Sequence, residues 1–79
     1  MKVEVLLFAS ARAWAGRERL ELEAAEGATV RALLDAPELA GLRPHLASTR
    51  FAVNEEFAPL ERPLRDGDVV AVLPPVSGG

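Results

Sequence analysis

The chain contains no cysteine, and this absence removes several kinds of chemistry at once. Disulfides, thiolate zinc sites, iron–sulfur clusters and thiol nucleophiles all require that side chain. The redox compartment stays open, because a cysteine-free chain is compatible with either one. If the chain takes part in covalent chemistry, another group must carry it.

Long apolar runs are also missing. The run Val5–Ala9 lies between Glu4 and Arg12, and it is shorter than the ~7–15 residues of a signal-peptide core. No stretch approaches the ~20 apolar residues of a membrane span. We therefore expect a cytoplasmic protein that has no membrane partner.

The sequence has no basic cluster. The formal net charge is −3, and the nine basic residues are scattered along the chain. Binding to a phosphate backbone needs a basic stripe, so we expect no nucleic-acid partner. Every basic residue except Lys2 is arginine, and the base composition of a GC-rich genome is the simplest explanation.

The 79 residues are 49% hydrophobic, which suits one small globular domain spanning residues 1–79. Alternation predicts strands over residues 2–8 and 19–23, joined by one or two helical turns over 9–15 that end at Gly16. Thr29 is a candidate helix N-cap, and the helix that it begins should close before Pro37. Short helical turns, interrupted at Pro44, should follow.

Two further strands are predicted, over residues 50–53 and 69–73, and Asp66-Gly67-Asp68 forms a turn before the last one. The order strand, strand, helix, strand, strand predicts an α+β fold of the β-grasp (ubiquitin-like) type. Its mixed sheet would have the first and last strands in the middle and one main helix packed across it. The expected core comprises Val3, Val5, Leu7, Leu22, Val30, Leu33, Leu34, Phe51, Val53, Leu64, Val70 and Val72.

The usual catalytic constellations are absent. His45 is the only histidine, and a surface loop position is the simplest interpretation of it. The Asp66 turn resembles the start of a calcium loop but has no closing Glu, so we expect Asp66 to bond its own backbone. Glu55 and Glu56 indicate a solvated turn. Trp14 is expected to cover the edge of the core, with an interface role as the alternative.

The C-terminus differs from the rest of the chain. Pro74 and Pro75 cannot donate to a sheet ladder, so residues 74–79 should form a flexible, projecting tail. Gly78 and Gly79 have no Cβ, and the final carboxylate could enter a narrow channel in a partner enzyme. Two terminal glycines arise by chance in roughly one protein in two hundred. The alternative is an ordinary frayed end.

The ending DGDVVAVLPPVSGG, residues 66–79, resembles the C-terminal signature of the small subunit of molybdopterin synthase (the MoaD family). The opening VLLFASARAWAG, residues 5–16, resembles that family's first strand and the basic residue after it, here Arg12. The segment AVNEEF resembles its third strand and Asn turn, here Asn54. Leu73 departs from the family, because many members have an aromatic residue there.

The resemblance implies a sulfur carrier that is not an enzyme by itself. Gly79 would be adenylated and then converted to a thiocarboxylate, and Gly78 would thread behind it. The carrier would donate sulfur to cyclic pyranopterin monophosphate to form the molybdopterin dithiolene. Implied partners are a large synthase subunit, in a heterotetramer of two small and two large subunits, a ubiquitin-activating-enzyme-like adenylyltransferase and a sulfur donor. No cofactor would be bound, and ATP would be used by the adenylyltransferase.

Alternation also predicts where the partners dock. If Val3, Val5 and Leu7 face the helix, alternate residues form an apolar patch on the opposite face of the sheet that runs towards the tail. The predicted partner interface contains Leu6, Phe8, Ala52, Ala71, Leu73, Pro74, Pro75, Val76 and Ser77. Alternative functions are a sulfur carrier for thiazole or tRNA thiolation, and a ubiquitin-like modifier conjugated through Gly79.

Overall fold

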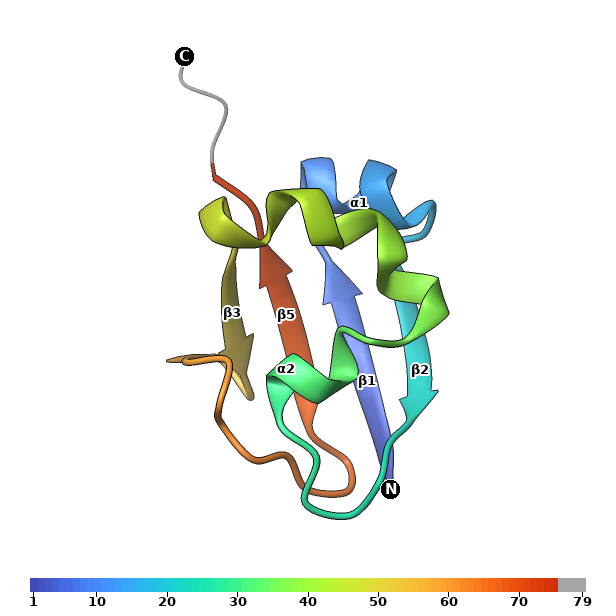
Figure 1. Cartoon of the computed structure of the whole chain (residues 1–79), viewed down its shortest axis with the longest axis vertical. Helices are drawn as coiled ribbons and strands as arrows, with labels where there is room; N and C mark the ends of the chain where they lie inside the picture. Colours follow the sequence, from blue (N-terminus) through green and yellow to red (C-terminus); the bar gives the residue numbers. More distant parts are fainter. Residues whose placement is uncertain (76–79) are drawn as a thin grey trace.

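A computed structural model describes residues 1–75 of the chain. Five strands form one mixed sheet in the order β2-β1-β5-β3-β4 (Figure 1). The strands are β1 (Lys2–Leu7), β2 (Arg19–Glu23), β3 (Arg50–Val53), β4 (Glu56–Ala58) and β5 (Val69–Leu73). The first and last strands, β1 and β5, are parallel and adjacent in the middle of the sheet, and the other neighbours are antiparallel. The predicted β-grasp fold is confirmed.

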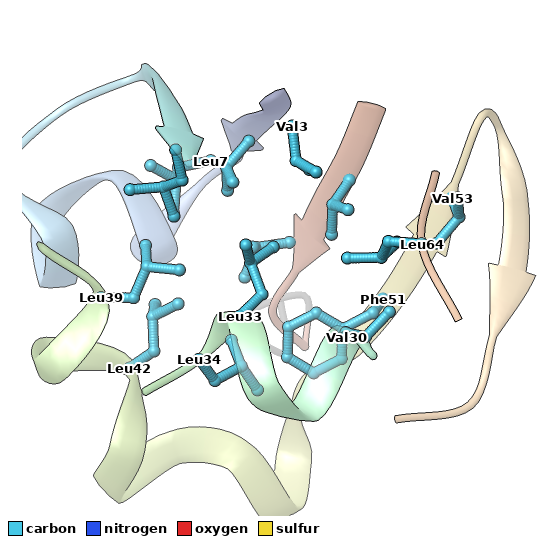
Figure 2. Close-up of a cluster of buried hydrophobic side chains, with 14 of the residues drawn as sticks. Val3, Leu7, Val30, Leu33, Leu34, Leu39, Leu42, Phe51, Val53 and Leu64 are labelled. Carbon is cyan, nitrogen blue, oxygen red and sulfur yellow. The ribbon is translucent and has the colours of Figure 1, made fainter. Parts of the chain in front are cut away.

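The core lies between the sheet and the helical segments, which Figure 1 shows on one face of the sheet. Val5 pairs with Val70 and Leu7 with Val72, so alternate residues of both central strands point to the helices. Every residue of the predicted core is buried. Ala11, Leu39 and Leu42 complete the cluster, and Figure 2 shows the two leucines beside Leu34.

The helical layer is divided into short segments. Thr29 caps α2 (Val30–Leu33) as predicted, because its Oγ1 accepts a hydrogen bond from the N–H of Ala32 at 3.2 Å. The chain then continues as a run of 3₁₀ turns, η1 (Pro37–Ser48), instead of a longer α-helix. Pro37 prevents helical geometry at Ala36, which is extended with ψ of 136°. Pro44 removes a donor inside η1.

Close contact with α1 (Ser10–Ala15) also shapes η1. A Cβ on Gly41 would lie 2.1 Å from the carbonyl oxygen of Trp14, so only glycine fits there. Trp14 covers the core edge as predicted. The expectation of a surface loop for His45 was wrong, since its half-buried ring stacks on Trp14. The two ring centroids are 3.8 Å apart and the ring planes differ by 3°. Stacking across two segments is tertiary and leaves no signal in the local sequence.

The strand β4 was not predicted from the sequence. Asn54 and Glu55 have φ of 51° and 72°, and two consecutive positive φ angles are typical of a two-residue hairpin loop. The solvated turn predicted for the two glutamates is therefore correct for Glu55, whereas Glu56 begins an edge strand. Phe57 follows it in β4 and is 71% exposed.

The turn before β5 is hydrogen-bonded to the start of β1, which is distant in the sequence. Gly67 has φ of 86°, as the predicted turn requires. Asp66, however, does not bond its own backbone, because its Oδ1 accepts from the N–H of Lys2 at 2.7 Å. Asp68 closes the turn by accepting from the N–H of Arg65 at 2.8 Å. Lys2 is remote in sequence, and only the folded sheet brings it to Asp66.

Candidate functional site

The base of the tail is fixed by the central pair of strands. Leu73 is the last residue of β5, where it pairs with Arg50 of β3, and Pro74 and Pro75 follow it. Because β5 runs parallel to β1, the chain leaves the sheet at the end where β1 stops and α1 begins (Figure 1). The predicted site residues Val76, Ser77, Gly78 and Gly79 lie outside the described residues.

The face of the sheet opposite the helices carries the predicted apolar patch. Strand register places Leu6, Ala71 and Ala52 side by side across β1, β5 and β3. Phe8 and Leu73 lie at the tail end of the same face, and the N–H of Phe8 donates to the carbonyl of Val72 at 3.3 Å. The structure therefore brings these five predicted residues together.

The residues of the patch differ in exposure: the alanines form a low floor, and larger side chains stand beside it. Ala52 is only 7% exposed, so it forms part of the floor and offers little contact area. Phe8 is 43% exposed. Phe57 extends the row, because β4 pairs it directly with Ala52. Phe57 is the functional candidate that sequence reasoning missed, and alternation carried across the Asn54 hairpin would have found it.

Two hollows flank the small residues of this outer face. One, of about 420 Å³, is lined by Leu6, Phe8, Asn54, Glu55, Val69 and Ala71. The other, of about 540 Å³, lies at the tail base and is lined by Ala47, Ser48, Thr49, Arg50, Phe57, Leu73, Pro74 and Pro75. Two phenylalanines thus stand at the sides of a shallow alanine floor. Such a surface suits the entry of apolar side chains from another protein.

Charged residues border this surface. Arg19 of β2 forms an ion pair with Glu4 of β1 at one side. At the other side the guanidinium carbon of Arg50 lies 5.9 Å from the ring centroid of Phe57, within the range of a cation–π contact. An apolar centre with charges at its rim is the usual anatomy of a protein interface.

A buried carboxylate fixes the hairpin that carries Phe57. Asn54 donates from Nδ2 to Asp68 at 2.9 Å, and its Oδ1 accepts from the N–H of Val69 at 2.9 Å. Burial acts to raise the pKa of Asp68, but hydrogen bonds from the Arg65 backbone and the Asn54 side chain outweigh it and hold that pKa below its usual range. Asp68 is therefore an ionised structural anchor between the hairpin and β5.

The described residues carry little other chemistry. Among residues 1–75, no group of three His, Asp or Glu side chains lies close enough to hold a metal ion. Over the same range, no helix is long and apolar enough to cross a membrane. Arg12 lies exposed on α1. Over the described residues, the candidate site is therefore an apolar face of the sheet beside Pro74 and Pro75.

A mixed sheet with a parallel central pair, covered by helical segments on one face, defines a ubiquitin-like β-grasp protein. Within that class the chain belongs to the ThiS family, whose family model matches residues 5–79. A molybdopterin synthase sulfur carrier subunit from Mycobacterium tuberculosis is 40% identical over 82 residues, covering 100% of this chain and 99% of that protein. The subunit of that name from Chlamydomonas reinhardtii is 38% identical, with both chains covered completely.

Solved structures agree with this assignment. SAMP1 from Haloferax volcanii superposes with a TM-score of 0.90 at 29% identity, covering 100% of each chain. A protein in the complex of subunits 1 and 2 of molybdopterin-converting factor from Helicobacter pylori has a TM-score of 0.69 at 36% identity, again over 100% of both chains. The fold and the family are therefore shown by full-length likeness.

Proposed function

We propose that this chain is the sulfur carrier subunit of a molybdopterin synthase. The observation that carries the proposal is the full-length likeness to proteins of that name, combined with a Gly-Gly end separated by four residues from the central strand β5. The chain has no thiol, and the described part has no metal cluster. We propose, as the family resemblance implies, that the sulfur is carried on the carboxyl carbon of Gly79.

The proposed cycle uses partners for every catalytic step. An adenylyltransferase joins the Gly79 carboxylate to AMP from ATP, and pyrophosphate leaves. A sulfur donor then displaces AMP and leaves a thiocarboxylate on Gly79. The large synthase subunit holds cyclic pyranopterin monophosphate, and two such transfers build the dithiolene. Gly78 contributes by having no Cβ where the channel must close around the chain. The carrier needs no bound cofactor of its own.

Docking on the outer face positions the tail. Leu73 belongs both to the apolar patch and to the tail base, so a partner that covers Leu6, Phe8 and Ala71 lies within reach of Pro74 and Pro75. Val76 and Ser77 would then lead into its active site. We propose that the large subunit and the adenylyltransferase use this face one at a time. The synthase would contain two small and two large subunits, as the family resemblance implies.

Removal of Gly79 tests the carrier function directly. The truncated chain should fold like the parent, because the described core ends at β5. It should support no molybdopterin formation with purified large subunit, adenylyltransferase, ATP and sulfur donor. Intact mass spectrometry of the full chain should show the thiocarboxylate. Molybdopterin formation by the truncated chain would refute the proposal.

A second candidate is a protein modifier joined through Gly79 to amines of other proteins. The TM-score of 0.90 to SAMP1 favours it, because a protein of this fold from H. volcanii is named small archaeal modifier protein 1. A carrier for thiazole synthesis or tRNA thiolation is a further alternative within the ThiS family. A blot with an antibody against this chain distinguishes the modifier, which alone produces high-mass conjugates.

A further inference from the structure

The hollow of about 420 Å³ on the outer face is apolar except at the end formed by the β3–β4 hairpin. Most of it is lined by residues of β1, of β5 and of the segment after β1, namely Leu6, Phe8, Val69 and Ala71. The other two lining residues, Asn54 and Glu55, form the hairpin loop. Among the described residues that line the hollow, Glu55 alone is ionisable.

The two loop residues differ in what holds them. The N–H of Asn54 donates to the carbonyl of Val69 at 2.8 Å, and its Oδ1 accepts from the N–H of Val69 at 2.9 Å. These bonds fix the hairpin against β5. Glu55 is exposed, and it takes part in no ion pair within residues 1–75. The hairpin therefore places an unpaired carboxylate residue at the end of an apolar hollow.

The backbone conformation of Glu55 is unfavourable for its residue type. Its φ is 72°, in the left-handed region, where the Cβ of an ordinary residue approaches the following carbonyl oxygen. Glycine is the preferred residue at the second position of such a two-residue hairpin loop. Asparagine tolerates positive φ well, which accounts for Asn54 at φ 51° but not for Glu55. The fold alone would therefore favour glycine at position 55.

Docking on the outer face changes what Glu55 requires. A partner that covers Leu6 and Ala71 removes water from the hollow, and a carboxylate that loses water without gaining a partner is costly. A long basic side chain offsets this cost, because its apolar stem can cover Leu6 and Ala71 while its charged head reaches Glu55. Glu4 of β1 already pairs with Arg19, so Glu55 is the carboxylate left for the partner's cation.

This inference rests on the proposed function, because it concerns the same docking face. We propose that Glu55 is a specificity-determining residue of this face and that it binds an arginine of the partner protein in the hollow. Arginine suits the site better than lysine, because guanidinium is more weakly hydrated and pairs with a carboxylate through two N–H groups. Arginine is also enriched in protein interfaces, whereas lysine is depleted. The fixed hairpin positions Glu55 before the partner arrives, which lowers the ordering cost of binding.

Charge substitutions at Glu55 test the proposal. Each full-length variant is titrated into the purified large synthase subunit by calorimetry. Glu55→Gln should bind about tenfold more weakly than the parent, and Glu55→Lys about a hundredfold more weakly, because it sets two cations against each other. The matched control is Glu38→Lys, since Glu38 is exposed on η1, in the layer that covers the opposite face of the sheet (Figure 1). Its Kd should stay within about twofold of the parent.

Replacement by glycine separates binding from folding. Glu55→Gly removes both the carboxylate and the backbone strain, so it should raise the Tm of the free domain by about 2–6 °C. It should nevertheless bind the large subunit about tenfold more weakly, as Glu55→Gln does. A purely structural role for Glu55 would give the opposite result, a lower Tm with an unchanged Kd.

The outcomes distinguish this inference from the proposed function. If the parent, Glu55→Gln and Glu55→Lys bind the large subunit with equal Kd, the inference is overturned and the carrier function is untouched. If the parent forms no complex with the large subunit, the proposed function fails and the inference fails with it. Acetylation of the large subunit's lysines should preserve the difference between the parent and Glu55→Gln, because guanidinium is not acetylated. Loss of that difference would assign the cation to lysine and overturn the arginine pairing.

Discussion

Phe51 and Phe57 provide a matched pair that separates folding from docking. They lie on neighbouring strands, where Phe51 pairs with Ala58 and Phe57 pairs with Ala52. The two phenylalanines therefore point to opposite faces of the sheet. Phe51 points into the core and is 4% exposed, whereas Phe57 is 71% exposed on the outer face. The same substitution to alanine should therefore affect different properties at the two positions.

The magnitudes follow from the areas involved. A phenylalanine buries about 150–250 Å² when fully covered, so covering the exposed part of Phe57 would remove roughly 100–180 Å² from water. At ~25 cal/mol per Å² this is about 2.5–4.5 kcal/mol. Ordering costs reduce the net effect to about 2–3 kcal/mol, or roughly 30–150-fold in Kd. Phe51→Ala should instead cost about 3–5 kcal/mol of folding stability.

Calorimetry and denaturant unfolding measure the two effects. Phe57→Ala should keep the free energy of unfolding within about 1 kcal/mol of the parent and bind the large synthase subunit about 30–150-fold more weakly. Phe51→Ala should be largely unfolded at room temperature, because small domains have only a few kcal/mol to lose. Unchanged affinity of Phe57→Ala would place β4 outside the interface, and a folded Phe51→Ala would refute the assigned inward face.

Three further substitutions address the docking face, the tail and the turn. Phe8→Asp should weaken the complexes with both the large subunit and the adenylyltransferase in calorimetry without unfolding the free domain, and unchanged affinity for both would move the interface elsewhere. Gly78→Val should abolish adenylation or transfer at an unchanged melting temperature, whereas full activity would show that the tail is not threaded. Asp68→Asn should cost about 1–3 kcal/mol at pH 7, because hydrogen bonds to a charged group are lost. Folding lowers the pKa of Asp68. The stability that its ionised carboxylate adds to the fold is therefore complete above the unfolded pKa near 3.9 and is lost as the pH falls through the folded pKa. The free energy of unfolding of Asp68→Asn should therefore not show this loss at acid pH. If the variant and the parent depend on pH identically, Asp68 is not an ionised structural anchor.

Periodic features were predictable from the sequence, and features that depend on tertiary contact were not. Alternation in β1 and β5 identified both the inward valines and the outer patch, because a strand offers only two faces. The edge strand β4 is three residues long and follows a loop in which Glu55 takes positive φ, a conformation for which glycine is the usual signal. The stack of His45 on Trp14 has no local signature. The assignments of Gly78 and Gly79 stay predictions, since they lie outside the described residues.

The parallel pairing of β1 with β5 connects the docking face to the tail. If β5 were antiparallel to β1, the chain would leave the sheet at the opposite end, where Lys2 begins β1. The observed pairing instead places the end of β5, at Leu73, beside Arg50 of β3 and next to Phe8, whose N–H donates to the carbonyl of Val72. Under the proposed function, one apolar contact would therefore both bind the domain and position its terminus. For the proposed carrier, which would visit several enzymes, each partner would then have to recognise only this one face.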